Sequence, residues 1–241
     1  MLVLRSVPLR LCALLFLVAS LAFGQSPSPY SHGDPTDEEQ LFLEFINQAR
    51  ASIDEEITRL TNTTDPDVLD SIDFFNVDLN LMASQFETLK NNNGNSQMPL
   101  AFNPLLIEAS RKHSEDMFIN VFQGHESSSN ALGENVAGDK HGTRIENEGY
   151  DAFGSAENVF SAADSVWHGH AGFNIDWGNG PGGMQDPAGH RNSIHANGRR
   201  EAGIGVYLGT RDQTERPGST SIISPSQPFS DVGPVLVTQV F

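Results

Sequence analysis

The fold of this chain is decided by the stretch Ala202-Gly203-Ile204-Gly205-Val206-Tyr207-Leu208-Gly209, in which small and apolar residues alternate. This period of two is typical of a β-strand. A second strand is predicted over Pro234-Val235-Leu236-Val237-Thr238-Gln239-Val240-Phe241. The Pro- and Ser-rich stretch from Arg216 to Phe229 joins the two strands, and Ser221-Ile222-Ile223 within it is a candidate for a short additional strand.

Helices are predicted upstream of these strands. From Glu38 onward, apolar residues recur at the spacing of one helix face, at Leu41, Phe42, Phe45, Ile46 and Ala49. Thr36 is expected to cap this helix, with Glu39 three residues later. The segment from Asp54 to Lys90 alternates helical apolar spacing with Asp-Pro and Asn-rich breaks, which indicates a helical insertion.

Two further helices complete the expected order of elements. One runs from Pro104 to about Asn120, where the proline suits the first helical turn. The other is predicted from about Ala156 to Trp167, because its apolar residues follow helical spacing. Since helices come first and strands last, the order favours an α+β fold with helices packed on an antiparallel sheet.

The N-terminal residues are typical of a secretory signal. Arg5 and Arg10 precede an apolar run from Leu11 to Phe23, and Ala22-Phe23-Gly24 is a small-residue site at which a signal peptidase could cut. The run is shorter than the roughly 20 residues of a membrane-spanning helix. We therefore expect residues 1–24 to be a signal peptide and the protein to be secreted or periplasmic, with no membrane span.

A single domain over residues 38–241 is expected to follow a flexible leader over residues 25–37. The only cysteine, Cys12, lies in the signal, so the domain has to fold without disulfides. The formal net charge of -17 makes nucleic acid and anionic lipid poor partners. The charge either keeps an exported protein soluble or attracts calcium or a cationic polymer. We expect a monomer.

Three polar clusters are candidates for chemistry: Gly124-His125-Glu126-Ser127, Ala156-Glu157-Asn158-Val159, and Pro187-Ala188-Gly189-His190-Arg191-Asn192-Ser193-Ile194. Taken singly, none is specific, because a lone histidine is more often a hydrogen-bonded structural residue than a ligand. The serines at 127–129 indicate a turn rather than part of a catalytic triad, since triad members are rarely neighbours in sequence.

The order of these clusters resembles the CAP superfamily, also called the SCP or pathogenesis-related-1 fold, in its bacterial secreted form. The likeness is carried by Phe45-Ile46-Asn47-Gln48-Ala49-Arg50, then by Ala109, His113, Ser114 and Met117, by the three clusters above, by Glu201-Ala202-Gly203-Ile204-Gly205-Val206, and by Val237-Thr238-Gln239-Val240-Phe241. The resemblance implies a three-layer α-β-α sandwich with a central, mainly antiparallel sheet. It also implies a large cleft, which in many members holds two histidines and two acidic residues, sometimes with zinc or another divalent ion.

Carried over by position, the resemblance makes His125 and His190 the two histidines and Glu157 the acidic residue. The chain departs from the family at the fourth position, where Trp167 is followed by His168-Gly169-His170 instead of a glutamate. His168 or His170 is a candidate substitute, with His170 assigned to the metal set, or the position is open to water. Trp167, His168 and Asn158 are expected to contact a ligand in the same cleft.

Two imidazoles and one carboxylate form a ligand set suited to zinc, with a water at an open fourth position. Bound zinc would lower the pKa of that water to about 7. Glu134, in a literal Gly-Glu-Asn, is a rival to Glu157, which we prefer. Asp176, Asn179 and Asp186 offer oxygens to calcium, although a Gly-rich loop lining the cleft is the simpler interpretation.

Three functions follow, in order of preference. The first is a binding module whose cleft holds a divalent ion and a small-molecule, lipid, peptide or cell-wall ligand. The second is a zinc-dependent hydrolase acting on peptides, with Glu157 as general base and catalytic residue. The third is a purely structural exported domain in which the polar residues brace loops.

Overall fold

The computed structural model describes residues 31–212, 215 and 231–241, which belong to one compact unit. The predicted signal peptide, the leader up to residue 30 and the candidate strand Ser221-Ile222-Ile223 lie outside the described residues. Within them, no helix is long and apolar enough to cross a membrane.

A four-stranded sheet with the order β1-β3-β6-β2 forms the centre of the domain. Its strands are β1 (Ala101–Phe102), β2 (Glu157–Ala163), β3 (Glu201–Leu208) and β6 (Val235–Val240). The β1 and β3 strands are parallel, whereas β3, β6 and β2 pair antiparallel. Two short strands, β4 (Arg211–Asp212) and β5 (Asp231–Val232), form a separate antiparallel pair. The expected mainly antiparallel sheet, and the strands predicted near residues 202–209 and 234–241, are confirmed.

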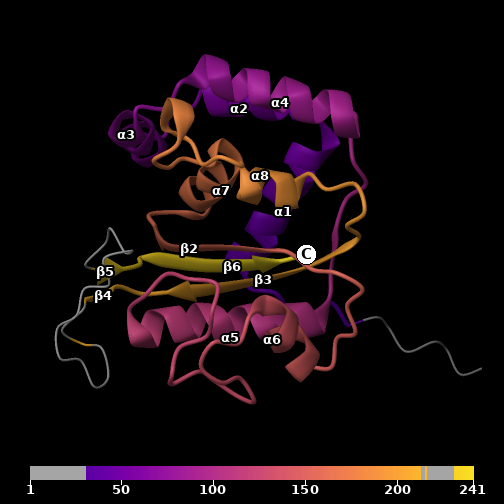
Figure 1. Cartoon of the computed structure of the whole chain (residues 1–241), viewed down its shortest axis with the longest axis vertical. Helices are drawn as coiled ribbons and strands as arrows, with labels where there is room; N and C mark the ends of the chain where they lie inside the picture. The colour runs from indigo at the N-terminus through magenta and orange to yellow at the C-terminus, as the bar shows by residue number, and fades with distance from the viewer. Residues whose placement is uncertain (1–30, 213–214, 216–230) are drawn as a thin grey trace, which may run out of the picture. The chain divides into compact units, whose positions relative to one another are not determined.

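Helices cover both faces of the sheet (Figure 1). One face carries α5 (Pro104–Asn120) and α6 (His141–Asn147). The other face carries α1 (Asp37–Ala51), α7 (Val166–Ile175) and α8 (Gly189–Ile194), and beyond these helices lie α2 (Ile53–Thr61), α3 (Pro66–Phe75) and α4 (Leu79–Asn93). A short 3-10 helix, η1, spans Pro181–Gly183. The α+β class and the helix–sheet–helix layering are thus confirmed, and the segment from Asp54 to Lys90 is helical, as expected.

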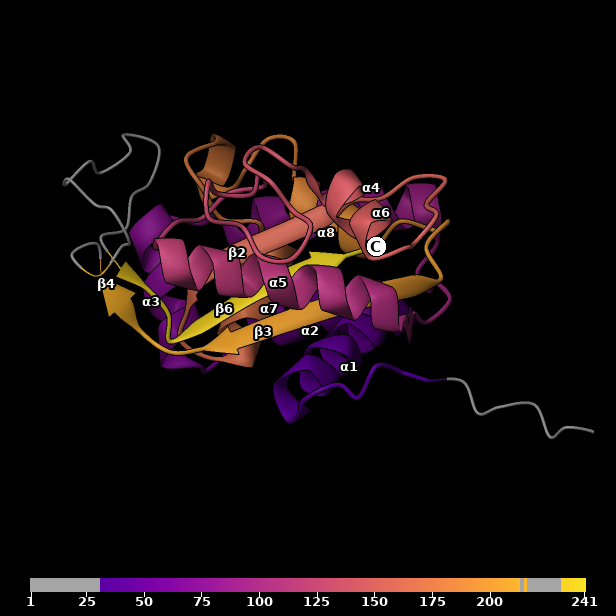
Figure 2. The same cartoon turned by 90° about the horizontal axis from the view of Figure 1, so that it is seen from below.

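Helix α5 lies directly against β3, as Figure 2 shows. The hydroxyl of Ser110 donates to the carbonyl oxygen of Gly203 at 3.1 Å, and that of Ser114 donates to the carbonyl of Gly205 at 2.8 Å. A Cβ atom on either glycine would come within 2.2 Å of the α5 backbone. Only glycine allows so close an approach. Gly203 and Gly205 of β3 therefore set the distance between α5 and the sheet.

The predicted first helix is confirmed as α1, and its N-terminus has the expected capping box. The side chain of Thr36 accepts a hydrogen bond from the Glu39 amide, and the Glu39 carboxylate accepts one from the Thr36 amide. Phe42 and Ile46 are fully buried and join the core cluster between α1 and the sheet. The helix predicted over 104–120 is likewise confirmed as α5, with Asn103 as its cap.

The helix predicted from Ala156 to Trp167 is wrong. Glu157–Ala163 form β2, which pairs antiparallel with β6, and a new helix begins only at Val166 with Ser165 as its cap. Most of β2 is buried, including neighbouring residues that face opposite sides of the sheet. A strand that is buried on both faces does not alternate apolar with polar residues. Its sequence pattern therefore cannot be distinguished from that of a buried helix. Trp167 therefore lies in the first turn of a helix rather than at the end of one.

A buried polar network joins the outer helices to α7. Oε1 of Glu56 lies 3.0 Å from Nε2 of His170, and Arg59 pairs with the other oxygen of the same carboxylate. Asn174 contacts His170 and lies 3.1 Å from Nε2 of His195. Burial, the largest cause, lowers the pKa of His195 to about 3. The network is therefore built around a neutral His195.

This burial predicts a pH-dependent stability. The pKa of an unfolded histidine is near 6.5, so below that pH the unfolded chain binds a proton at residue 195. Folded His195, whose pKa is about 3, does not bind it. The stability due to this group is fully present above pH ~6.5 and is lost as the pH falls toward 3, by about 1.4 kcal/mol per pH unit. In urea titrations between pH 7 and 4.5, His195→Gln should flatten the pH slope of the unfolding free energy by that amount. His32→Gln, at an exposed position, should keep the parent slope. An unchanged slope in His195→Gln would contradict the prediction.

Candidate functional site

The first element of the site is an ion pair at the start of β2. Glu157 is the first residue of this strand, and its side chain is completely buried. Its Oε1 lies 3.0 Å from Nδ1 of His125, and its Oε2 pairs with the guanidinium of Arg144 from α6. Arg144 also donates to the carbonyl oxygens of His125 and Asp139. The histidine side chain is 52% exposed, so the carboxylate orients an imidazole that faces solvent.

Opposing effects set the charge of Glu157. Burial, the largest of them, raises the pKa of this carboxyl, but the hydrogen bond with His125 and the positive charge of Arg144 contribute to a lowering that outweighs it. The net pKa is below its ordinary value, so Glu157 is ionised at neutral pH. A carboxylate with a lowered pKa and both oxygens engaged is a weak base. Its geometry fits the positioning of His125 better than general-base chemistry.

The second element is a histidine–carboxylate pair at the start of α8. Asp176 ends α7 in the left-handed conformation, with φ 61°, and its side chain is completely buried. Its Oδ1 lies 2.7 Å from Nδ1 of His190, while Oδ2 accepts from the backbone amides of His190 and Arg191. Asp176 thus caps α8 and fixes the ring of His190. None of the hydrogen bonds of His190 to the described residues uses Nε2, and its side chain is 19% exposed.

The structure brings His125 and Glu157 together, whereas His190 pairs with Asp176. Asn158, next to Glu157, donates to the carbonyl oxygen of His190 at 3.3 Å, so the two pairs flank the same end of β2. Within the described part of the chain, no three His, Cys, Asp or Glu side chains form a group that could hold a metal ion. Both oxygens of Glu157 are engaged by protein groups. As placed, the predicted set of His125, Glu157 and His190 does not fit a zinc ion bound by all three side chains.

The remaining predicted site residues lie on α7 or the neighbouring strand. His170 is completely buried beside Glu56, in the network that joins the outer helices. Asp164 donates its amide to Nδ1 of His168, so the proton of this neutral ring is on Nε2, which donates to the Ser71 hydroxyl at 2.9 Å. Trp167 packs on Phe45 and His170, and Asn158 bonds to Gln239 of β6. His168 is thus hydrogen-bonded to Ser71 and Asp164, and His170 is paired with Glu56.

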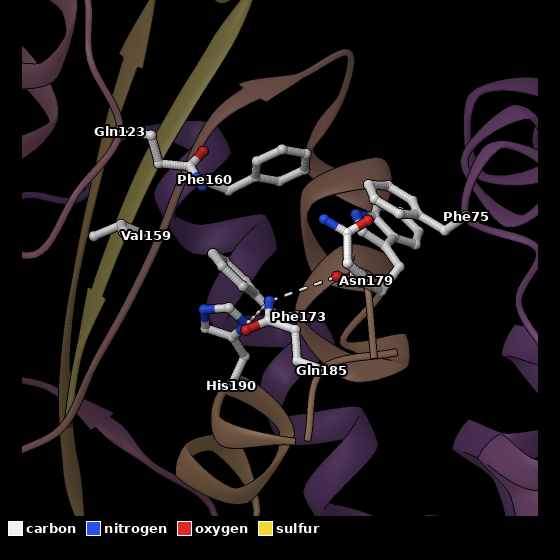
Figure 3. Close-up of a pocket in the computed structure, with 11 residues that line it drawn as sticks. Phe75, Gln123, Val159, Phe160, Phe173, Asn179, Gln185 and His190 are labelled. Atoms are coloured by element: carbon white, nitrogen blue, oxygen red, sulfur yellow. Dashed lines mark hydrogen bonds between the residues drawn. The ribbon is translucent and has the colours of Figure 1, made fainter. Parts of the chain in front are cut away.

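A cavity of about 340 Å³ lies beside His190, and Figure 3 shows its walls. We call it the His190 pocket. Four aromatic side chains line it: Phe75 from α3, Phe160 from β2, Phe173 from α7, and Trp177. Its polar lining consists of the amides of Gln123, Asn179 and Gln185 and the imidazole of His190, and Val159, Gly172 and Gly178 complete the wall. The Gly-rich loop after α7 therefore lines a cavity, as the simpler interpretation of that segment held.

Sequence reasoning missed two residues that hold the histidines in place. Arg144 gave no signal, because an arginine in a polar segment has no pattern that reveals a buried partner. Asp176 was noted only as a calcium candidate, yet it accepts hydrogen bonds from the start of α8. Glu134 is exposed, whereas Glu157 is buried at the start of β2 rather than at the start of the helix for which it was preferred. Ser128 precedes a turn at residues 129–130, accepts a hydrogen bond from the Asn130 amide, and donates its hydroxyl to Asp116 of α5.

The buried Arg144–Glu157 pair predicts a large stability effect. Arg144→Met would leave the Glu157 carboxylate buried without its cation, which typically costs about 3–5 kcal/mol. Urea unfolding at pH 7 should show this loss. Arg200→Met, at an exposed position, should change the unfolding free energy by less than about 0.5 kcal/mol. A loss below about 1 kcal/mol in Arg144→Met would contradict the role assigned to this pair.

No protein-family model matches the chain, and no curated protein does. Among solved structures, the chain is similar to an extracellular protein containing an SCP domain from Bacillus anthracis, with 14% sequence identity and a TM-score of 0.39. The match covers 74% of this chain and 44% of the other, so the chain spans less than half of that protein's length. A likeness at this level transfers neither a family nor an activity, and the fold described here rests on the chain's own strands, helices and contacts.

Proposed function

We propose that this chain is an exported ligand-binding module whose His190 pocket takes the apolar part of a small or extended ligand. The observation that carries the proposal is a cavity of about 340 Å³ whose aromatic wall stands beside an imidazole fixed by a buried carboxylate. Ligand sites in proteins are mostly apolar cavities of about 300–1,000 Å³ with a few placed polar groups. Export is proposed from the residues of the predicted signal peptide.

The polar groups of the pocket favour a ligand with one hydrogen-bonding end. Asp176 holds Nδ1 of His190, which leaves Nε2 for a ligand atom. Asn179 and Gln185 add amide groups that both donate and accept. The net charge of -17 disfavours anionic ligands such as fatty acids. The ligand class that fits best is a neutral or cationic molecule with an apolar or aromatic body.

Metal binding, which was part of the first function predicted from the sequence, and peptide hydrolysis, the second, remain predictions and rank below ligand binding. The placement of Glu157 supports neither, since its oxygens are engaged by His125 and Arg144. A divalent ion would use the Nε2 atoms of His125 and His190, because Nδ1 of each ring is engaged by a carboxylate. A purely structural role does not explain the cavity beside His190. We therefore rank ligand binding above a structural role.

Blocking the pocket should abolish binding of an apolar probe. Asn179 is exposed and lines the cavity, so Asn179→Trp would place an indole ring at the lip without disturbing the core. With N-phenyl-1-naphthylamine as a neutral fluorescent probe, the dissociation constant should rise at least about tenfold in Asn179→Trp and change less than about threefold in Asn179→Ala. Equal binding by the two variants, or no binding by the parent protein, would remove the proposal.

The zinc prediction has a separate test. If zinc is bound, mass spectrometry of natively purified protein should find about one zinc ion per chain, and His125→Ala and His190→Ala should each lose it. A parent protein without zinc after incubation with the ion would end this alternative. The result has no bearing on the fluorescent probe, because the probe contacts the aromatic wall.

A further inference from the structure

A second cavity, of about 330 Å³, adjoins the His190 pocket and has a different character. We call it the acidic pocket. It lies between α3, the end of β2 and the start of α7, and it shares Phe75, Phe160 and Trp177 with the His190 pocket. The residues that belong to it alone include three carboxylates, Asp67, Asp70 and Asp164. The proposed function gives it no role, and of its lining residues only His168 was predicted from the sequence to contact a ligand.

Aromatic rings form the wall of the acidic pocket. Phe74 is 75% exposed, so its ring is accessible to a ligand. Its ring stands nearly perpendicular to that of Phe75, with 4.9 Å between centroids, and Phe75 stacks on Trp177 at 6.3 Å. Phe160 meets Trp177 edge to face at 6.4 Å. These rings form the apolar part of the pocket lining, and the face of an aromatic ring carries partial negative charge.

Within the described residues, the ion-pair contact printed for the carboxylates of this pocket is that of Asp164 Oδ2 with Nδ1 of His168, at 3.2 Å. The sequence has no lysine or arginine from residue 60 to 89 or from 145 to 190, the two segments that form the walls. Within the described ranges, Asp67, Asp70 and Asp164 make no ion pair with a lysine or arginine.

His168 does not supply the missing charge. Its Nδ1 accepts a hydrogen bond from the Asp164 amide, so the ring is neutral in this arrangement. Burial, the largest cause, lowers the pKa of His168 despite the nearby aspartates. The pocket therefore combines aromatic faces with uncompensated negative charge.

We propose that the acidic pocket binds an organic ammonium group, with a quaternary ammonium of the choline type as its best occupant. A cation over the face of an aromatic ring is attracted by the ring quadrupole, and aromatic cages are a recurrent solution for quaternary ammonium ligands. The methyl groups of such a ligand contact Phe74, Phe75 and Trp177, while the carboxylates at the rim supply long-range attraction. A hydrated inorganic cation gains nothing from the rings, which distinguishes this site from a calcium site.

The proposal does not depend on the His190 pocket being a ligand site. Asp67, Asp70 and Asp164 do not line that pocket, and Asn179 and His190 do not line this one. Asparagine substitutions of the three aspartates should therefore leave binding of N-phenyl-1-naphthylamine unchanged. Failure of either proposal can be recognised while the other stands.

Calorimetric titration of choline into the purified full chain tests the site. Choline should bind with a dissociation constant of about 1 mM or lower. The triple variant Asp67→Asn, Asp70→Asn and Asp164→Asn, which keeps the shape of the pocket, should weaken binding at least about tenfold. Phe74→Leu keeps an apolar side chain but removes the ring, and it should weaken binding about two- to fivefold.

Two controls separate the cage from general effects. The neutral isostere of choline, 3,3-dimethyl-1-butanol, should bind at least about tenfold more weakly, because only its charge differs. The triple variant Glu44→Gln, Glu55→Gln and Asp73→Asn changes the net charge equally at exposed positions outside the pocket, and it should bind choline within about twofold of the parent. The proposal is overturned if choline does not bind, if the neutral isostere binds as well, or if both triple variants weaken binding equally.

Discussion

The close approach of α5 to β3 is the constraint on which the rest of the structure depends. Gly203 and Gly205 have no side chain toward the helix, and Ser110 and Ser114 use the short distance to donate hydrogen bonds to the carbonyl oxygens of β3. Ser114 also donates to Thr238 of β6, which ties the helix to the next strand. Because α5 covers one face of the sheet, α1, α7 and α8 pack on the opposite face. Strand β2 is at the edge of the sheet, and its first residues contact His125 and His190.

Among the described residues, a buried carboxylate holds a histidine in three places, with different outcomes. Glu157 orients His125 toward solvent, Asp176 holds His190 beside a cavity, and Glu56 encloses His170 inside the helical layers. The carboxylates are completely buried in each case, so the exposure of the imidazole decides what it can do. A half-exposed or rim-placed ring is available to a ligand, whereas an enclosed one stabilises the packing of helices.

The sequence predicted much of the fold because its signals were local. The cap at Thr36, the proline in the first turn of α5 and the alternation in β3 depend on residues close together in the chain. The segment 156–167 was mispredicted because its environment is not local: β2 is covered on both faces by elements from elsewhere in the chain. The candidate site was predicted in part for the same reason. His125 and Glu157 were identified through a resemblance, but their contact and its support from Arg144 arise only when the chain folds and Arg144 of α6 reaches the start of β2.

By itself, the sequence determined the α+β class, the cap of the first helix, the two long strands, and an acidic composition that disfavours polyanionic partners. Those properties follow from period, capping chemistry and charge, which need no knowledge of distant contacts. The tertiary structure decided that His190 pairs with Asp176 rather than with Glu157, and that rings from α3, β2 and the loop after α7 line two adjoining cavities. Only the tertiary structure could decide these points, because residues far apart in the chain form a pocket. Packing sets the distances between them, and their spacing in the sequence does not.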